Sequence, residues 1–158
     1  MKKLFKIATN NNTMVADLLK NQEIIDRTKV NPFDEPRITS SIKNTGRSKI
    51  IISGVNTAVC TCFPAISARN AGYTAYAAID ASGAFDKIEL QTAITRMTQA
   101  GVIVADYNAI VVEMLENNAD PLAAQVYAAI GLSHFVSLRD IYGTMTASRT
   151  VSQARVKE

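Results

Sequence analysis

The sequence predicts an α/β protein with an open, mostly parallel sheet, and three observations carry this prediction. Residues 50–52 form a continuous β-branched apolar run, which is typical of a strand buried on both faces of a parallel sheet. Strand-like and helix-like segments alternate along the chain, which favours a three-layer α/β/α arrangement. The chain has 158 residues, enough for one domain with a single core. We expect residues 1–143 to form that domain and residues 144–158, which contain few hydrophobic residues, to form a C-terminal tail.

The segments before the central strand are predicted from turn and cap residues. In order, they are a strand over residues 4–8, a helix over residues 13–19, a strand over residues 23–25 and a helix over residues 35–45. Asp34 is expected to cap the last of these, because Pro36 fits a first helical turn and Gly46 follows the end. That helix leads into the central strand.

The elements from the central strand onwards are predicted from the same signals. They are a strand over residues 50–52, a helix over 60–71, a strand over 73–79, a helix that begins after residue 86, a strand over 102–105, and helices over 107–117, 120–131 and 133–142. Asp86 and Glu89 resemble a capping box, and Asp120 before Pro121 indicates another helix start. The apolar residues expected to face inward on these helices include Met97, Ile110, Met114, Leu122 and Ile130.

Cys60 lies where the central strand gives way to the next helix. A helix N-terminus offers unpaired N–H groups and the positive end of the helix dipole, and both stabilise a thiolate. Pro64 is tolerated only near the start of a helix, so we expect Cys60 at or next to the N-cap. Open α/β sheets bind ligands at the carboxyl ends of their strands. Cys60 is therefore a candidate nucleophile, although a free cysteine is also commonly a small buried hydrophobe.

Composition and charge argue against several classes of function. The net charge is only +3 and Lys and Arg are dispersed, so no nucleic-acid footprint is present. No stretch approaches the ~20 apolar residues of a membrane span, and Lys6 interrupts the apolar run that a signal peptide needs. Cys60 and Cys62 are too close for an ordinary disulfide, and a single histidine, His134, does not make a zinc site. We expect a cytoplasmic protein without a metal, a cofactor, or a nucleic-acid or membrane partner.

Several spaced motifs surround Cys60. The residues of the first are Gly54, Thr57, Cys60, Gly72, Tyr73, Asp80 and Ala81. They resemble the isochorismatase-like cysteine hydrolases, whose pattern is a buried strand, G-(V/I)-x-T-x-x-C, a helix ending in G-(Y/F), a strand and D-A. Residues 63–68 and 80–85 are similar to the motifs F-P-A-L-S-A and D-A-S-G-(T/A)-F of one subgroup. Residues 27–34 and 96–101 resemble two further motifs of that subgroup, so the likeness covers about residues 20 to 115.

The resemblance implies a Rossmann-like, isochorismatase-like fold and hydrolysis of a small amide, ester or related C–N bond. In such an enzyme a thiolate attacks the carbonyl carbon, a carboxylate transfers protons, a cation stabilises the thiolate and backbone N–H groups bind the oxyanion. By this resemblance Cys60 is the nucleophile, and Val55, Asn56 and Val59 bind the substrate around it. The family also implies a cis peptide bond, which falls here between Val55 and Asn56.

The resemblance also implies a cation shortly before the segment that corresponds to residues 31–34. Arg27 lies closest to the place of the family's lysine, and Lys29 follows it. An arginine is a fixed cation that does not transfer protons. Both charges are equally consistent with solvated loop residues, so Arg27 is a candidate catalytic residue with that alternative open.

The family's first strand, which carries the catalytic aspartate, has no counterpart before Arg27, so we expect an N-terminally shortened fold. In the family this strand lies beside the strand of the cysteine, and its absence leaves central backbone groups unpaired. We expect residues 4–8 or another chain to fill the gap, which favours a homo-oligomer. Two function classes follow: a cysteine hydrolase with a small-molecule substrate, or a non-catalytic relative that serves as an oligomeric scaffold or a redox-sensitive thiol protein.

Overall fold

The computed structural model describes residues 25–131, in two compact units that divide between residues 107 and 108. The elements expected over residues 4–8, 13–19 and 133–142 lie outside the described residues, as do the tail and most of the strand expected over residues 23–25. The domain boundary expected at residue 143 therefore stays a prediction.

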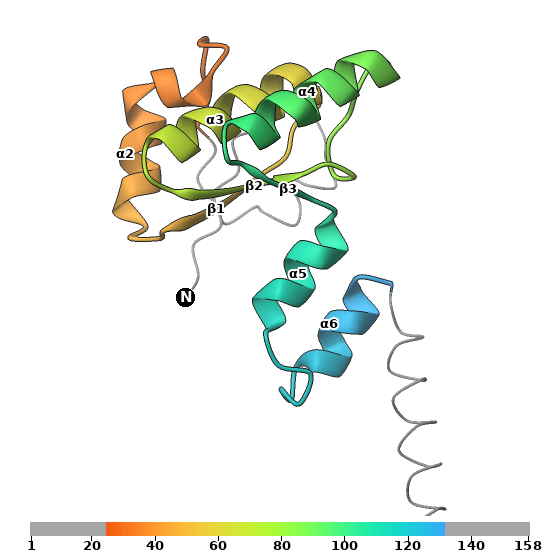
Figure 1. Cartoon of the computed structure of the whole chain (residues 1–158). Coiled ribbons are helices and arrows are strands. Elements are labelled where there is room, and N and C mark those ends of the chain that lie inside the picture. Colours follow the sequence, from red (N-terminus) through yellow and green to blue (C-terminus); the bar gives the residue numbers. More distant parts are fainter. Residues whose placement is uncertain (1–24, 132–158) are drawn as a thin grey trace, which may run out of the picture. The chain divides into compact units, whose positions relative to one another are not determined.

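The first unit contains a three-stranded parallel sheet with the strand order β1-β2-β3 (Figure 1). The strands are β1 (Lys49–Ile52), β2 (Thr74–Ala78) and β3 (Ile103–Ala105). In the register, Ile51 pairs with Tyr76, and Tyr76 pairs with Ile103. The sheet confirms the predicted α/β class and all three strands expected from residue 50 onwards.

Helices α3 (Cys62–Asn70) and α4 (Lys87–Gln99) lie over the same face of this sheet (Figure 1). Each helix connects one parallel strand to its neighbour. Such crossovers are right-handed, and the strand order advances in the same direction twice, so both helices lie on the same side of the sheet. The core between helices and sheet consists of Ile52, Cys62, Ala65, Ala68, Ala75, Ala77, Ala93, Met97 and Val102. Its many alanines let α3 lie close to the strands, so the start of α3 is held against a packed core.

The opposite face of the sheet carries the row of Ile51, Tyr76 and Ile103, because side chains alternate along each strand. An apolar row on this face fits a sheet with helices on both sides. Ile51 is nevertheless 48% exposed, so the prediction that its strand is buried on both faces is wrong at this residue. Among the described residues β1 pairs with β2 alone, which leaves Ile51 at the edge of the described sheet.

Helix α2 (Pro36–Asn44) precedes β1 and follows a 3-10 turn, η1 (Pro32–Asp34). Asp34 belongs to that turn, so the prediction that Asp34 caps α2 is wrong. Asn31 caps the 3-10 turn by accepting a hydrogen bond from Phe33 N at 3.2 Å. Glu35 stands at the N-cap of α2 without a side-chain cap, because the preceding residues are already used in the tighter turn. Ile38 and Ile42 form the buried face of α2 and make a small core with Ile25.

The second unit contains α5 (Tyr107–Leu115), apart from its first residue, and α6 (Ala123–Ala129). Ile110 and Ile130 are buried, as predicted. Met114 is 64% exposed and Leu122 is 57% exposed, so the expected burial of these two side chains is wrong within the described residues. Leu122 stands at the N-cap of α6 rather than on its inward face, and Met114 lies in the last turn of α5.

Candidate active site

Cys60 lies in a single π-helical turn, η2 (Thr57–Thr61), between β1 and α3. Asn56 caps this turn with its side chain, whose Oδ1 accepts a hydrogen bond from Val59 N at 3.1 Å. The Asn56 carbonyl accepts from Cys60 N at 2.8 Å and from Thr61 N at 3.3 Å. Helical backbone therefore begins at Thr57, earlier than predicted, whereas α3 itself starts at Cys62 with Thr61 as its N-cap, so Cys60 lies next to the N-cap of α3 as predicted. Asn is a strong N-cap residue, and it starts the helix one turn before the cysteine.

Gly54 explains how Cys60 fits against the end of β1. A Cβ atom at Gly54 would lie 2.6 Å from the Cys60 Cβ, which is closer than such atoms approach. Only glycine leaves room for the half-buried cysteine at this point. The first glycine of the motif thus sets the position of the Cys60 side chain.

The loop of residues 80–83, which follows β2, is hydrogen-bonded to the segment that carries Cys60. Gly83 N donates to the Gly54 carbonyl at 3.0 Å. The Gly83 carbonyl accepts from Thr57 N at 2.7 Å and from Thr57 Oγ1 at 2.6 Å. A Cβ atom at Gly83 would lie 2.2 Å from the Val55 carbonyl oxygen, so this close approach requires glycine.

The hydroxyl of Ser82 joins the same two segments. It donates to the Ala78 carbonyl at 2.6 Å, and it accepts from Gly54 N at 3.3 Å and from Thr61 Oγ1 at 3.1 Å. One donor and two acceptor sites are all that a serine hydroxyl has, so its hydrogen-bonding capacity is fully used. Thr57 and Thr61 are both fully buried, so these bonds satisfy polar groups that water does not reach.

The residues expected to bind the substrate, Val55, Asn56 and Val59, lie in η2 or directly before it, in different environments. The Val55 side chain is 73% exposed, whereas the N–H groups of Val59 and Cys60 are both bonded to Asn56. The Asn56 amide donates from Nδ2 to Glu89 Oε1 at 2.7 Å. All peptide bonds of the described residues are trans, so the cis bond expected between Val55 and Asn56 is absent.

Glu89 was expected only as half of a capping box, and the structure gives it a second role. Asp86 caps α4 as predicted, since its Oδ1 accepts from Glu89 N at 2.8 Å. The Glu89 carboxylate does not return to the Asp86 backbone. Its Oε2 accepts from Phe85 N at 3.2 Å, and its Oε1 holds the Asn56 amide. Sequence reasoning missed this contact because the two residues belong to separate motifs.

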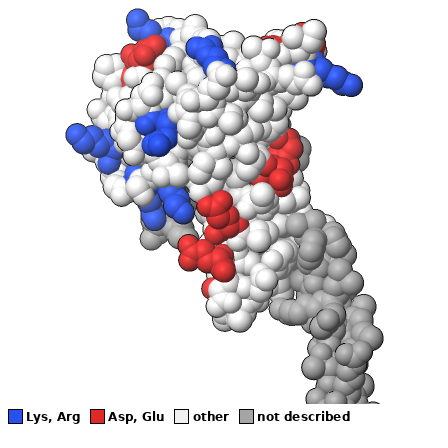
Figure 2. Space-filling model, in the orientation of Figure 1, with Lys and Arg blue, Asp and Glu red and all other residues white. Residues whose placement is uncertain are grey.

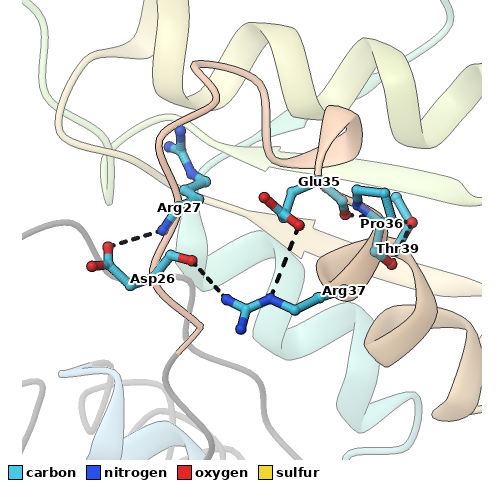
Figure 3. Close-up of polar contacts among 6 residues, drawn as sticks. All are labelled: Asp26, Arg27, Glu35, Pro36, Arg37 and Thr39. Atoms are coloured by element: carbon cyan, nitrogen blue, oxygen red, sulfur yellow. Dashed lines mark hydrogen bonds and ion pairs between the residues drawn. The ribbon is translucent and has the colours of Figure 1, made fainter.

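Arg27 lies in a loop before η1 whose hydrogen bonds are mostly local. Its Nη1 donates to the carbonyls of Lys29 and Val30, the latter at 2.7 Å. Figure 3 shows that a different arginine, Arg37, ties this loop to α2: its Nη2 donates to the Asp26 carbonyl at 3.1 Å. Among the described residues no hydrogen bond or ion pair joins Arg27 to Cys60.

One long-range contact links the Arg27 loop to the helix that follows Cys60. Asn31 Nδ2 donates to Ser67 Oγ at 2.9 Å, and Ser67 belongs to α3. Both residues lie in motifs that the sequence analysis singled out. The contact therefore joins the end of the loop to α3, the helix that begins two residues after Cys60.

The two thiols differ sharply in their surroundings. Cys60 is half-buried, and within residues 25–131 its sulfur has no hydrogen-bond partner, carboxylate or otherwise. Cys62 is 0% exposed, and this burial raises the pKa of its thiol, an effect that the nearby Arg96 guanidinium partly opposes. Arg96 lies 5.2 Å from the centre of the Phe63 ring, a cation–π distance. Of the two, only Cys60 is open to a ligand.

Figure 2 shows the distribution of charged side chains on one face of the molecule. On the face drawn in Figure 2, Lys and Arg form separate patches with uncharged surface between them. Within residues 25–131, no group of His, Cys, Asp and Glu is arranged to hold a metal ion. In the same range, every helix is too short or too polar to cross a membrane.

Comparison with known proteins gives one family and several related structures. A family model described as an isochorismatase domain matches residues 5–109. The chain is 40% identical over 72 residues to the probable hydrolase YcaC of Escherichia coli (strain K12), an alignment that covers 46% of this chain and 35% of that protein. The chain thus matches about a third of the length of this curated relative.

Two solved structures share the fold. One is YcaC from Pseudomonas aeruginosa with hexane-2,5-diol and covalent acrylamide, with a TM-score of 0.73, 24% identity, and coverage of 84% of this chain and 66% of that one. The other is the Escherichia coli YcaC gene product, described as an octameric hydrolase of unknown specificity, with a TM-score of 0.70, 27% identity, and coverage of 89% and 67%.

Proposed function

This chain belongs to the isochorismatase family, and we propose that it is a cysteine hydrolase that cleaves a small amide, ester or related C–N bond through a Cys60 thiolate. The observation that carries the proposal is the position of Cys60: a half-buried thiol in the first turn of a helix, at the carboxyl end of a parallel strand. Ligands of open α/β sheets bind at this end of the strands. The match to a probable hydrolase from Escherichia coli supports the same class of reaction.

The proposed reaction has two steps. The Cys60 thiolate attacks the carbonyl carbon, a C–S bond forms, and the C–N or C–O bond breaks as the leaving group takes up a proton. Water then attacks the thioester, releases the carboxylic acid and restores the thiol. In this proposal Val55, Asn56 and Val59 contact the substrate, because they lie in or directly before the turn that carries Cys60, and Arg27 supplies a fixed positive charge.

One observation favours the second candidate, a non-catalytic relative that acts as a scaffold or a redox-sensitive thiol protein. Among residues 25–131 no carboxylate lies within hydrogen-bond distance of the Cys60 sulfur. A thiol hydrolase needs a group that takes up and returns protons. In the hydrolase proposal this carboxylate comes from outside the described residues or from a neighbouring chain. A homo-oligomer in the cytoplasm is part of the proposal, and the Escherichia coli relative is described as octameric.

The rate at which acrylamide alkylates Cys60 separates the two candidates. Acrylamide is a small amide electrophile, and one related structure carries it covalently. At pH 7 we expect Cys60 in the full chain to react at least about tenfold faster than N-acetylcysteine amide, because an activated thiol is more thiolate at neutral pH. Peptide mass spectrometry locates the label, and a panel of small amides and esters tests turnover and protection.

Two variants control this experiment. Cys60→Ser removes the label and any turnover, whereas Cys62→Ala leaves both unchanged, since Cys62 is fully buried. A Cys60 that reacts no faster than the free thiol, with no turnover on the panel, would overturn the hydrolase proposal and leave the scaffold.

A further inference from the structure

We propose that Glu89 is a positioning residue for Cys60, which it acts on through Asn56; this inference rests on the proposed cysteine hydrolase. Glu89 lies in the first turn of α4 and is half-buried. Its Oε1 accepts from Asn56 Nδ2 at 2.7 Å and its Oε2 accepts from Phe85 N at 3.2 Å. Both carboxylate oxygens are therefore engaged, and neither touches the thiol.

The carboxylate determines which way the Asn56 amide faces. An amide has one acceptor end and one donor end, whereas a carboxylate only accepts. Glu89 therefore accepts a hydrogen bond from Asn56 Nδ2, and this orients Asn56 Oδ1 to accept the hydrogen bond from Val59 N at 3.1 Å. This orientation is the one that caps the helix.

The cap governs the backbone that holds Cys60. The Asn56 side chain accepts a hydrogen bond from Val59 N. The Asn56 backbone carbonyl also accepts hydrogen bonds from Cys60 N at 2.8 Å and from Thr61 N at 3.3 Å. Without Glu89 the amide can turn over, and its Nδ2 then faces the Val59 N–H, so that two donors oppose one another. The first turn then loses its side-chain cap, and the position of Cys60 becomes less defined.

Helix α4, which carries Glu89, is itself held in place by its packing. Ala93 and Met97, one and two turns further along, are buried in the core. Asp86 cannot replace Glu89 in this role, because its Oδ1 already caps α4 itself. The contact thus transmits the position of a core helix to the turn of the nucleophile.

A reciprocal exchange of the two side chains tests this role. In Glu89→Gln the new amide has a single acceptor for two donors, Asn56 Nδ2 and Phe85 N. In Asn56→Asp two carboxylates face each other. The double variant Asn56→Asp, Glu89→Gln restores every bond with the roles reversed: the amide at position 89 donates to the carboxylate at position 56 and accepts from Phe85 N, and that carboxylate still accepts from Val59 N.

The readouts are exchange of the Val59 amide proton by NMR and alkylation of Cys60 by acrylamide. In each single variant we expect exchange at Val59 to rise about tenfold and alkylation to slow several-fold, because a lost side-chain cap changes a local equilibrium by about that factor. The double variant should return exchange at Val59 to within about twofold of the wild type; recovery is judged by exchange alone, because Asn56 is itself a proposed substrate contact. Glu35→Gln is the matched control, since Glu35 occupies an N-cap position without a side-chain bond there, and it should change neither readout.

The outcomes separate this inference from the proposed function. Unchanged exchange at Val59 in both single variants, or no recovery in the double variant, would overturn the positioning role. Equal acceleration at Val59 and at Ala93, in the middle of α4, would also overturn it, because that pattern indicates a global loss of stability. If wild-type Cys60 proves no more reactive than a free thiol while the exchange pattern still recovers, the hydrolase proposal fails and the orientation of the cap by Glu89 stands.

Discussion

The turn of residues 54–61 and the loop of residues 25–31 carry the two candidate catalytic residues, and they are held in opposite ways. The turn is fixed from outside, by Ser82 and Gly83 after β2 and by Glu89 on α4. Within the loop, the Arg27 side chain is fixed locally: its guanidinium binds carbonyls two and three residues further along the same loop. The candidate nucleophile is therefore positioned by tertiary structure, and the candidate cation by its own chain neighbours.

This difference predicts that substitutions in the two regions affect the stability of the fold and the reactivity of Cys60 to different degrees. Substitutions in the contacts around the turn should weaken folding and Cys60 reactivity together, because these contacts join the ends of β1 and β2. Substitution of Arg27 should affect reactivity with little effect on folding.

The largest effect is expected from Gly83→Ala. The added Cβ would meet the Val55 carbonyl oxygen at 2.2 Å, and this backbone atom cannot move aside as the end of a flexible side chain can. We expect the free energy of unfolding in urea to fall by about 3 kcal/mol. Gly46→Ala is the matched control: its φ is +65° but no atom lies within 4 Å of the new Cβ. That variant should lose only about 1 kcal/mol, and equal losses in the two variants would contradict a steric role for Gly83.

A smaller effect on folding is expected from Arg27→Ala. The variant removes bonds to carbonyls of an exposed loop, so the free energy of unfolding should fall by less than about 1 kcal/mol. Acrylamide alkylation of Cys60 should nevertheless slow several-fold, since the proposed cation is lost. Lys29→Ala, which removes a neighbouring exposed charge, should leave the alkylation rate unchanged. If Arg27→Ala destabilises the chain as much as Gly83→Ala does, the loop is not the local structure described above.

The smallest effect concerns Cys62, beneath the turn. Burial raises the pKa of its thiol in the folded state above the ordinary value of 9.0, and Arg96 offsets part of this. The folded state then holds its proton more tightly than the unfolded state, so the contribution to stability is fully present below pH 9.0 and is lost as the pH rises through the folded-state value. Urea titrations above pH 9.0 should show this fall in the wild type and in Cys60→Ala, but not in Cys62→Ala. A fall that persists in Cys62→Ala would assign it to another group.

Much of the fold follows from local sequence signals. The apolar run of residues 50–52, Asp86 at a helix start and glycines after helices each predict a boundary from a few neighbouring residues, and the structure confirms the corresponding elements. The helical turn before α3 is missing from the prediction, because Pro64 indicates only where α3 itself begins. An Asn three residues before the N–H that it caps is a local signal that would have corrected this.

The assembly of the site could not be predicted in the same way. Ser82 and Gly83 stood out as parts of a motif, but their roles depend on where β2 ends relative to β1. The Asn56–Glu89 contact joins segments that no sequence period relates. Whether Arg27 approaches Cys60 depends on the path of a whole loop, and residue spacing alone does not determine that path.

The hydrogen bonds between Gly83 and the segment that carries Cys60 also limit which segments can be exchanged between homologous proteins. Its N–H binds residue 54 and its carbonyl binds residue 57, so the two segments fit each other as a matched pair. A chimera that takes the cysteine segment from one homologue and the loop after the next strand from another would combine parts shaped for different partners. Engineers who wish to graft a new specificity onto this scaffold should transplant both segments together.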